Sequence, residues 1–289
     1  MIQIIGSIVV VGCVIGGFLL EGGRVIALWH PTEVLIIIGA AFGAFMTGNP
    51  PRVTKGAFLG ALRFVKGRRY TQEHYVTLLK CLYQVLVKIR KEGFVGIERD
   101  LEAPDGGPLF RNYPQIVADR HLMDFIRDGL RLMVTGNLDP QELESLLEQE
   151  LEVRHQEAHE PALAVQKVAD ALPGFGIVAA VLGIVNTMAA LDGADTATIG
   201  HKVGAALVGT FLGILVSYGF VGPIGAAMTH MAREETKALE VAKMALVATV
   251  RGYVPAVAIE FARKLLCGDT RPKFEELEAE LKGRSRVAA

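Results

Sequence analysis

The chain has 289 residues, of which 51% are hydrophobic and 21% charged, and its 30 basic and 31 acidic side chains leave a net charge of -1. Neither this balance nor any motif indicates a nucleic-acid partner. The average conceals a segregated sequence, because residues 52–170 and 229–289 hold nearly all the charge.

Four apolar segments are candidate membrane-spanning helices: residues 2–20, 34–47, 171–191 and 203–228. About 20 residues rising ~1.5 Å each match a hydrocarbon core of ~30 Å. The second span, opened by Glu33, is short, but neighbouring turn residues can extend it. The third and fourth spans contain no Asp, Glu, Lys, Arg or His. We therefore predict an all-α polytopic membrane protein with four transmembrane helices, whose last two spans cannot carry an ion by themselves.

The basic residues near the spans predict the orientation. The loop between the first two spans has only Arg24 and the loop between the last two only Lys202, so the middle segment and both termini should be cytoplasmic. The first helix should remain in the mature protein, because no basic n-region or A-x-A site marks a signal peptide. The basic cluster that follows the second span consists of Arg52, Lys55, Arg63, Lys66, Arg68 and Arg69.

The charged segments are predicted to be helical. Apolar residues from Tyr75 to Ile89 recur at steps of three and four, which indicates a helix ending near Gly93. A loop at residues 103–108 precedes a helix through residues 122–133, which Gly136-Asn137 ends, and an acidic helix starts at Asp139-Pro140. We thus expect a cytoplasmic helical domain at 51–170, and a helical tail at 229–289 interrupted at Gly252 and Pro255.

Several short motifs point to other functions but fit them poorly. Residues 174–179 match G-x-G-x-x-A but lie inside an apolar helix, without the βαβ unit of a dinucleotide site. His155 and His159 have a spacing that could hold zinc, yet a solvated helix face is the favoured interpretation in so charged a segment. No P-loop, G-x-S-x-G motif or Cys pair supports an enzyme. The widely separated Cys13, Cys81 and Cys267 are interpreted as reduced thiols.

Small and hydroxyl residues form a stripe on each of the last two spans. Such stripes are typical of close helix packing in lipid, and this explanation is favoured over an ion-path lining. Pro173 and Pro223 each remove a backbone N–H near the end of a span, which favours a hinge at both places. The stripe of the third span is Pro173, Gly176, Ala180, Gly183 and Thr187, and that of the fourth is Ala206, Thr210, Gly213 and Ser217.

Longer motifs resemble one known family over nearly the whole chain. Residues 172–183, 208–215 and 252–255 are similar to the flagellar motor stator subunit MotA, of the MotA/TolQ/ExbB superfamily. Residues 97–102 and 113–119 resemble the same family. Several long motifs in the right order are far more specific than any single match.

The resemblance implies a pentamer of this chain around a dimer of MotB, a single-span, peptidoglycan-binding partner, among the lipids of the inner membrane. MotB brings the carboxylate that binds the translocated ion, and ion flow drives rotation against the rotor switch-complex protein FliG. No cofactor is expected. The sequence agrees independently with the need for a partner. A proton relay in a membrane needs an ionisable residue, and the third and fourth spans have none.

Particular residues match the family one by one. Arg90 and Glu98 match the charged pair that engages the rotor; the alternative is an ordinary surface pair. Pro173 and Pro223 match the torque-related prolines, and Thr210 matches the hydroxyl residue near the carboxylate of the partner. Sodium-driven relatives have a threonine seven residues after the first proline, where this chain has Ala180. Since a methyl group offers no ligand to a hard cation, we predict proton coupling.

Three alternatives remain open. A TolQ- or ExbB-like energy transducer would also conduct protons, but has three spans and acts on an envelope protein. A self-contained secondary transporter would give solute or ion flux without a partner. A purely structural membrane scaffold would give none.

Overall fold

The computed structural model describes residues 2–66, 70–103, 107–136, 139–189 and 195–282. Every regular element within these ranges is a helix, which confirms the all-α class. The chain divides into two compact units, one formed by residues 1–67 with 158–231 and the other by 68–157 with 232–289. Two long helices, α9 (Pro140–Ala189) and α11 (Gly222–Val250), contribute to both units.

The first unit holds the apolar helices. Three helical stretches, residues 25–48, 140–189 and 196–250, are long and apolar enough to cross a membrane, and residues 5–20 form a shorter apolar helix. Only 17 to 28% of the most apolar window in each long stretch is buried, as expected where lipid or other subunits cover the surface. The count of four spans stays a prediction. Besides parts of α9 and α11, the unit contains α1 (Ile2–Leu20), η1 (Val25–Leu28), α2 (Pro31–Gly48), α3 (Pro51–Lys66), α10 (Thr196–Val216) and the π-helical η2 (Ser217–Val221).

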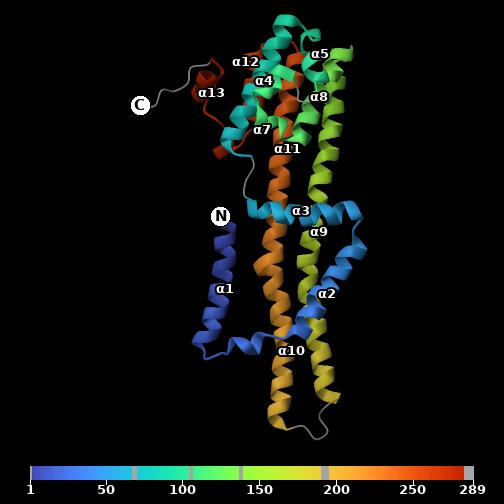
Figure 1. Ribbon diagram of the computed structural model, residues 1–289, viewed down its shortest axis with the longest axis vertical. Coiled ribbons are helices and arrows are strands. Elements are labelled where there is room, and N and C mark those ends of the chain that lie inside the picture. Colours follow the sequence, from blue (N-terminus) through green and yellow to red (C-terminus); the bar gives the residue numbers. More distant parts are fainter. Residues whose placement is uncertain (1, 67–69, 104–106, 137–138, 190–194, 283–289) are drawn as a thin grey trace. The chain divides into compact units, whose positions relative to one another are not determined.

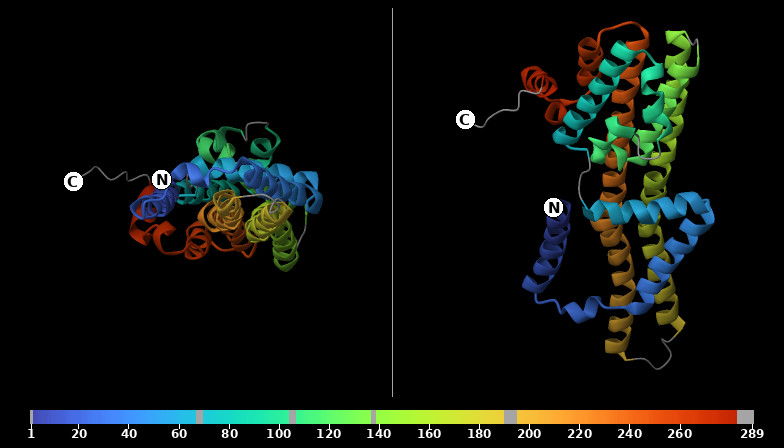
Figure 2. Two further views of the ribbon diagram at one scale, coloured as in Figure 1. Left: turned by 90° about the horizontal axis from the view of Figure 1, so that it is seen from below. Right: turned by 45° about the horizontal axis from the view of Figure 1, so that its top comes forward.

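Helix α3 runs across the long helices of this unit in Figure 1 and in the right-hand view of Figure 2. Two apolar residues of α3 explain this placement, because Val53 and Ala57 are buried in a cluster with Phe45 of α2 and Ala164 of α9. The basic Lys55 lies exposed on the same helix. The sequence assigned α3 to the cytoplasmic segment, whereas it packs with the apolar helices.

The second unit has a large apolar core. Helix α4 (Gln72–Glu92) supplies much of it, and the 3.6-residue repeat noted in its sequence is the buried face. Helix α8 (Arg120–Thr135) and the end of α11 complete the core, for example through Phe125 and Leu246, both 0% exposed. The remaining elements are α5 (Val95–Glu102), α6 (Gly107–Arg111), α7 (Pro114–Val117), α12 (Pro255–Lys264), η3 (Gly268–Thr270) and α13 (Phe274–Leu281).

Local capping explains where these helices begin and end. The Thr71 hydroxyl accepts a hydrogen bond from the His74 N–H at 3.4 Å and starts α4, while Gly93, at φ 73°, ends it. Asp119 caps α8 in the same manner, and Gly136 follows its last residue. The predicted ends of both helices are confirmed. The interruption of the tail is also confirmed, because Gly252 has φ 88° and lies between α11 and α12.

The course of the chain differs from the prediction over residues 140–189. The acidic helix predicted from residue 139 and the third span are one continuous helix, α9, which passes through Pro161 and Pro173 without a break. Residues 104–106 of the predicted loop, and Asn137, lie outside the described residues.

The three cysteines are free thiols, in agreement with their sequence interpretation. Cys81 is 0% exposed in the core of the second unit. Burial raises the pKa of its thiol to about 12, so it stays protonated and unreactive near neutral pH.

Candidate functional site

The last apolar part of α9 and helix α10 touch backbone to backbone. A Cβ added to Gly213 would lie 2.8 Å from the Leu172 carbonyl oxygen and 2.9 Å from the Gly176 Cα. A Cβ on Gly183 would lie 2.9 Å from that of Ala206. These positions therefore exclude larger residues, and this part of the two stripes serves close packing, as the favoured interpretation of the sequence had it.

Ala180 of α9 and Thr210 of α10 lie where these two helices cross and touch, a region called the crossing below. Ala180 is 8% exposed, and its backbone nitrogen lies 3.4 Å from the position of a Cβ on Gly209. The Thr210 Cα lies 3.4 Å from that of a Cβ on Gly176. Both residues predicted to line an ion path thus lie at the contact between α9 and α10.

The hydroxyl groups of the stripes differ in their partners. Thr187 donates to the Gly183 carbonyl at 2.7 Å, and Ser217 donates to the Ala169 carbonyl at 2.6 Å. Thr210 is half-buried, and within the described ranges its hydroxyl makes no hydrogen bond. A polar group at an apolar surface normally finds a partner, so Thr210 is the hydroxyl available to another chain or to an ion.

The Ser217 hydrogen bond explains how α9 continues through Pro173. Proline has no N–H, so the carbonyl four residues earlier, that of Ala169, loses its usual helical donor. The fully buried Ser217 supplies a replacement from the neighbouring helix. The bond therefore joins η2 to the proline site of α9.

Pro223 follows a local widening of its helix. The π-helical turn η2 ends two residues before Pro223, and the Gly222 N–H donates to the carbonyl of Ser217, five residues back. A π-turn of this kind accommodates a proline ring that would otherwise clash with the carbonyl one turn earlier. The sequence identified the position, but the π-turn and the Ser217 bond required the structure.

A second feature that the sequence missed is the burial of Glu33. It was expected simply to open the second span, yet its side chain packs against α10 and is 8% exposed as a residue. The signal was an acidic residue in the first turn of an otherwise apolar helix.

Arg90 and Glu98 lie in the second unit, on either side of the turn at Gly93. Arg90 is in the last turn of α4 and Glu98 in the first turn of α5. Both side chains are exposed, and in the described part of the chain neither forms an ion pair. Both charges are thus presented to solvent, in a geometry suited to contact with another protein.

A partly buried ion pair holds the helices that carry these charges. Lys88 Nζ of α4 lies 2.6 Å from Asp100 Oδ2 of α5, and Asp100 is 1% exposed. The other carboxylate oxygen accepts from the Leu109 N–H of α6 at 3.3 Å. Gly107, at φ 66°, allows this approach, because a Cβ there would lie 2.7 Å from the Asp100 Cα.

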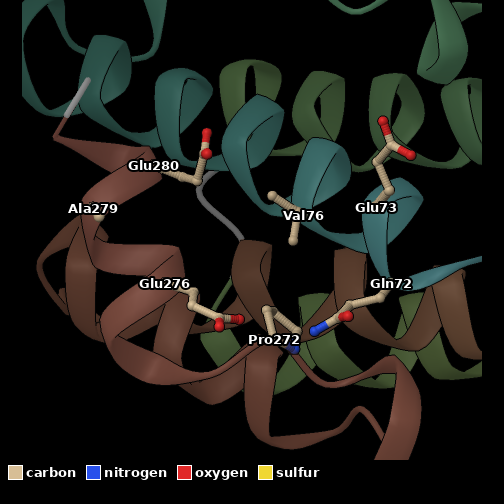
Figure 3. Close-up of a pocket in the computed structure, with 7 residues that line it drawn as sticks. All are labelled: Gln72, Glu73, Val76, Pro272, Glu276, Ala279 and Glu280. Carbon is tan, nitrogen blue, oxygen red and sulfur yellow. The ribbon is translucent and has the colours of Figure 1, made fainter. Parts of the chain in front are cut away.

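Other candidate sites in the second unit are weak. A cleft of about 310 Å³ lies between α4 and α13 and contains Glu73, Glu276 and Glu280 (Figure 3). Among the described residues no group of three or more His, Cys, Asp or Glu side chains could hold a metal. His155 is half-buried, and its Nδ1 lies 3.0 Å from the Thr236 hydroxyl, so it is more enclosed than a solvated helix face implies.

We expect Ser217→Ala to lower the free energy of unfolding by about 1–3 kcal/mol, because it leaves the Ala169 carbonyl buried without a donor. Thr229→Ala is the matched control, since Thr229 donates to the Gly225 carbonyl of its own helix. Thermal unfolding of the full chain in detergent, followed by circular dichroism, measures both. Equal stability of the two variants would contradict the assigned role of Ser217.

We expect Asp100→Asn to destabilise the second unit by about 2–4 kcal/mol, because Lys88 then keeps no anionic partner. Asp128→Asn is the control, as its pair with Arg131 is exposed and such pairs contribute ~0–1 kcal/mol. Urea unfolding of the full-length protein distinguishes them. If Asp100→Asn lowers the free energy of unfolding no more than the control does, Lys88 and Asp100 do not hold α5 in place.

Comparison with protein families gives two matches that together cover most of the chain. The family model described as "Motility protein A N-terminal" matches residues 4–93. The MotA/TolQ/ExbB proton channel family matches residues 117–241.

Curated relatives match over almost the full length. Motility protein A of Salmonella typhimurium is 41% identical over 278 residues, which are 96% of this chain and 94% of the relative. Motility protein A of Escherichia coli is 40% identical with the same coverage. Chemotaxis protein LafT of Vibrio parahaemolyticus is 41% identical over 96% of this chain and 97% of its own.

Solved structures share the fold. A chain of the C. jejuni MotAB structure matches with a TM-score of 0.77 at 20% identity, covering 94% of this chain and 98% of that one. The flagellar MotAB stator complex from Bacillus subtilis gives 0.70 at 23% identity, covering 89% and 92%. With this fold, and with relatives 40–41% identical over 96% of its length, the chain belongs to the motility protein A (MotA) family.

Proposed function

We propose that this chain is a stator subunit of the bacterial flagellar motor, which forms a proton-conducting complex with a MotB partner and converts ion flow into torque. The observation that carries the proposal is the crossing of α9 and α10. Ala180 and Thr210 both lie at this contact between two apolar helices, and among the described residues the Thr210 hydroxyl has no hydrogen-bond partner. Residues 171–191 and 203–228 supply no ionisable group, so a partner has to bring one.

The partner is a single membrane helix with a carboxylate and a peptidoglycan-binding domain. A carboxylate next to Thr210 would gain the Thr210 hydroxyl as a hydrogen-bond donor. Anchoring of the partner to the cell wall would hold the complex while the ring of this chain turns.

We propose a pentamer of this chain, and the apolar surface of the first unit supports its coverage by other chains and lipid. Large side chains stay exposed on both helices of the crossing, more than a monomer in water tolerates. Neighbouring subunits, the MotB dimer and membrane lipids together account for this surface. The exposed residues include Ile177, Val181 and Val185 on α9 and Leu207 and Ile214 on α10.

The complex belongs in the inner membrane with both termini cytoplasmic. Lys55 and Arg63 are exposed on α3, which follows the second apolar helix, whereas Arg24 is the basic residue of the loop before it. This asymmetry follows the positive-inside rule. In this orientation Arg90 and Glu98 would face the cytoplasm, where the rotor protein FliG is their proposed contact.

A TolQ- or ExbB-like transducer is the second candidate, because its family shares the match over residues 117–241. The match to the N-terminal region of motility protein A over residues 4–93 favours the stator. The names of the relatives, motility and chemotaxis proteins, agree with this choice and with a function other than catalysis.

Charge reversal tests the rotor contact. We expect Arg90→Glu and Glu98→Lys each to reduce swimming to below roughly half of the parent, because interfacial charges control encounter and register. Lys264→Glu, an exposed position in α12, is the control and should swim normally. Soft-agar motility of a strain that depends on this chain measures the effect. Normal swimming of both variants at normal protein levels would refute the rotor role of Arg90 and Glu98.

Ion replacement tests proton coupling. We expect flagellar rotation speed to stay unchanged when sodium is replaced by choline at constant pH, because Ala180 offers no oxygen ligand to a hard cation. A protonophore should stop rotation under the same conditions. The speed of tethered cells reports both effects, and a loss of speed on sodium removal alone would show sodium coupling.

A further inference from the structure

Glu33 is the one buried ionisable side chain among the described residues of the first unit. It belongs to the first turn of α2, and a Cβ on Gly209 of α10 would lie 3.5 Å from the Glu33 Cγ. Gly209 follows Val203, the start of the uncharged stretch, by six residues, or about 9 Å along a helix. The aliphatic part of the Glu33 side chain therefore lies beside the uncharged stretch of α10, about two turns from the start of that stretch.

The carboxylate belongs to a small polar cluster. The Thr32 hydroxyl donates to Glu33 Oε2 at 2.7 Å, and His30 Nδ1 lies 4.0 Å from the same oxygen. The other nitrogen of His30 is 3.1 Å from the Ala27 carbonyl of η1. These groups form a line of polar atoms from η1 to the start of α2.

The same contacts place Glu33 beside the predicted ion path. Gly209 precedes Thr210, and the position of its Cβ is also 3.4 Å from the Ala180 nitrogen. Because Gly209 has no side chain, it places no bulk between the Glu33 stem and this crossing. Burial of a carboxylate at an apolar surface costs several kcal/mol, and membrane-embedded acids usually serve ion or proton transfer.

A purely local explanation exists for an acid at this position. Glu is favoured in the first turn of a helix, where it interacts with free N–H groups and with the helix dipole. Gln serves the same hydrogen-bonding role with nearly the same shape. The two explanations therefore differ in what the neutral isostere does.

We propose that Glu33 is a proton-handling residue of this chain, which binds a proton arriving from the side of His30 and η1 and releases it toward the crossing at Ala180 and Thr210. The proposal rests on the proposed function as a proton-conducting stator. In each cycle one proton adds to a carboxylate oxygen of Glu33, and the same proton leaves for water on the way to the carboxylate of the partner, which restores the anion. No redox step or further reactant is needed.

Proton flux tests the proposal. The full chain and its partner subunit are reconstituted together in vesicles, a potential is imposed, and an internal pH-sensitive dye reports flux per assembled complex. We expect Glu33→Gln to lower the flux at least about tenfold, because the amide cannot bind and release the proton. Glu33→Asp should restore part of it. Glu21→Gln, an exposed acid of the same connection, is the matched control and should conduct like the parent.

Each outcome decides between the explanations. If the parent complex conducts and Glu33→Gln conducts within about twofold of it, Glu33 is a helix-capping residue and the proposal is wrong. If Glu33→Gln assembles poorly, Glu33→Asp and Glu33→His, which keep an ionisable group, are compared per assembled complex with Glu33→Ala; equal flux in all of them also overturns it. If the parent itself does not conduct, the proposed stator function fails instead.

Discussion

The direct contact between the backbones of α9 and α10 is the constraint on which the first unit depends. Glycine at 176, 183 and 213 is required because a Cβ at any of these positions would meet atoms of the facing helix. Such proximity also allows a side chain of one helix to reach the backbone of the other. The hydrogen bond from Ser217 to Ala169 is the result, and it supplies the donor that Pro173 removes.

This contact links the two prolines physically. Pro173 lies in α9 at the level of the Ser217 bond, and Pro223 follows the π-turn that Ser217 begins. A change in the bend of one helix therefore acts on the hydrogen bonding of the other. Helices with such substituted bonds can alter their bend without exposing an unsatisfied carbonyl, which suits a subunit that moves repeatedly.

Polar groups in the first unit fall into two sorts. Thr187 and Ser217 satisfy backbone carbonyls and stabilise the helices. Thr210 and Glu33 lie close to the glycine-rich crossing, where a stabilising role alone explains them less well.

The second unit shows the same division among its charges. Lys88 and Asp100 pair inside and hold α4, α5 and α6 together, whereas Arg90 and Glu98 stay exposed and unpaired in the described structure.

Local periodicity, caps and long motifs were enough to predict the helical class, the apolar segments, the ends of α4 and α8 and the family. The sequence also located Pro173, Ala180, Thr210 and Pro223. Which hydroxyls are paired depends on the tertiary fold, since Ser217 and its acceptor Ala169 are 48 residues apart in the sequence. The burial of Glu33 could not be read from the sequence, because it comes from packing against Gly209 of α10, a helix far along the chain.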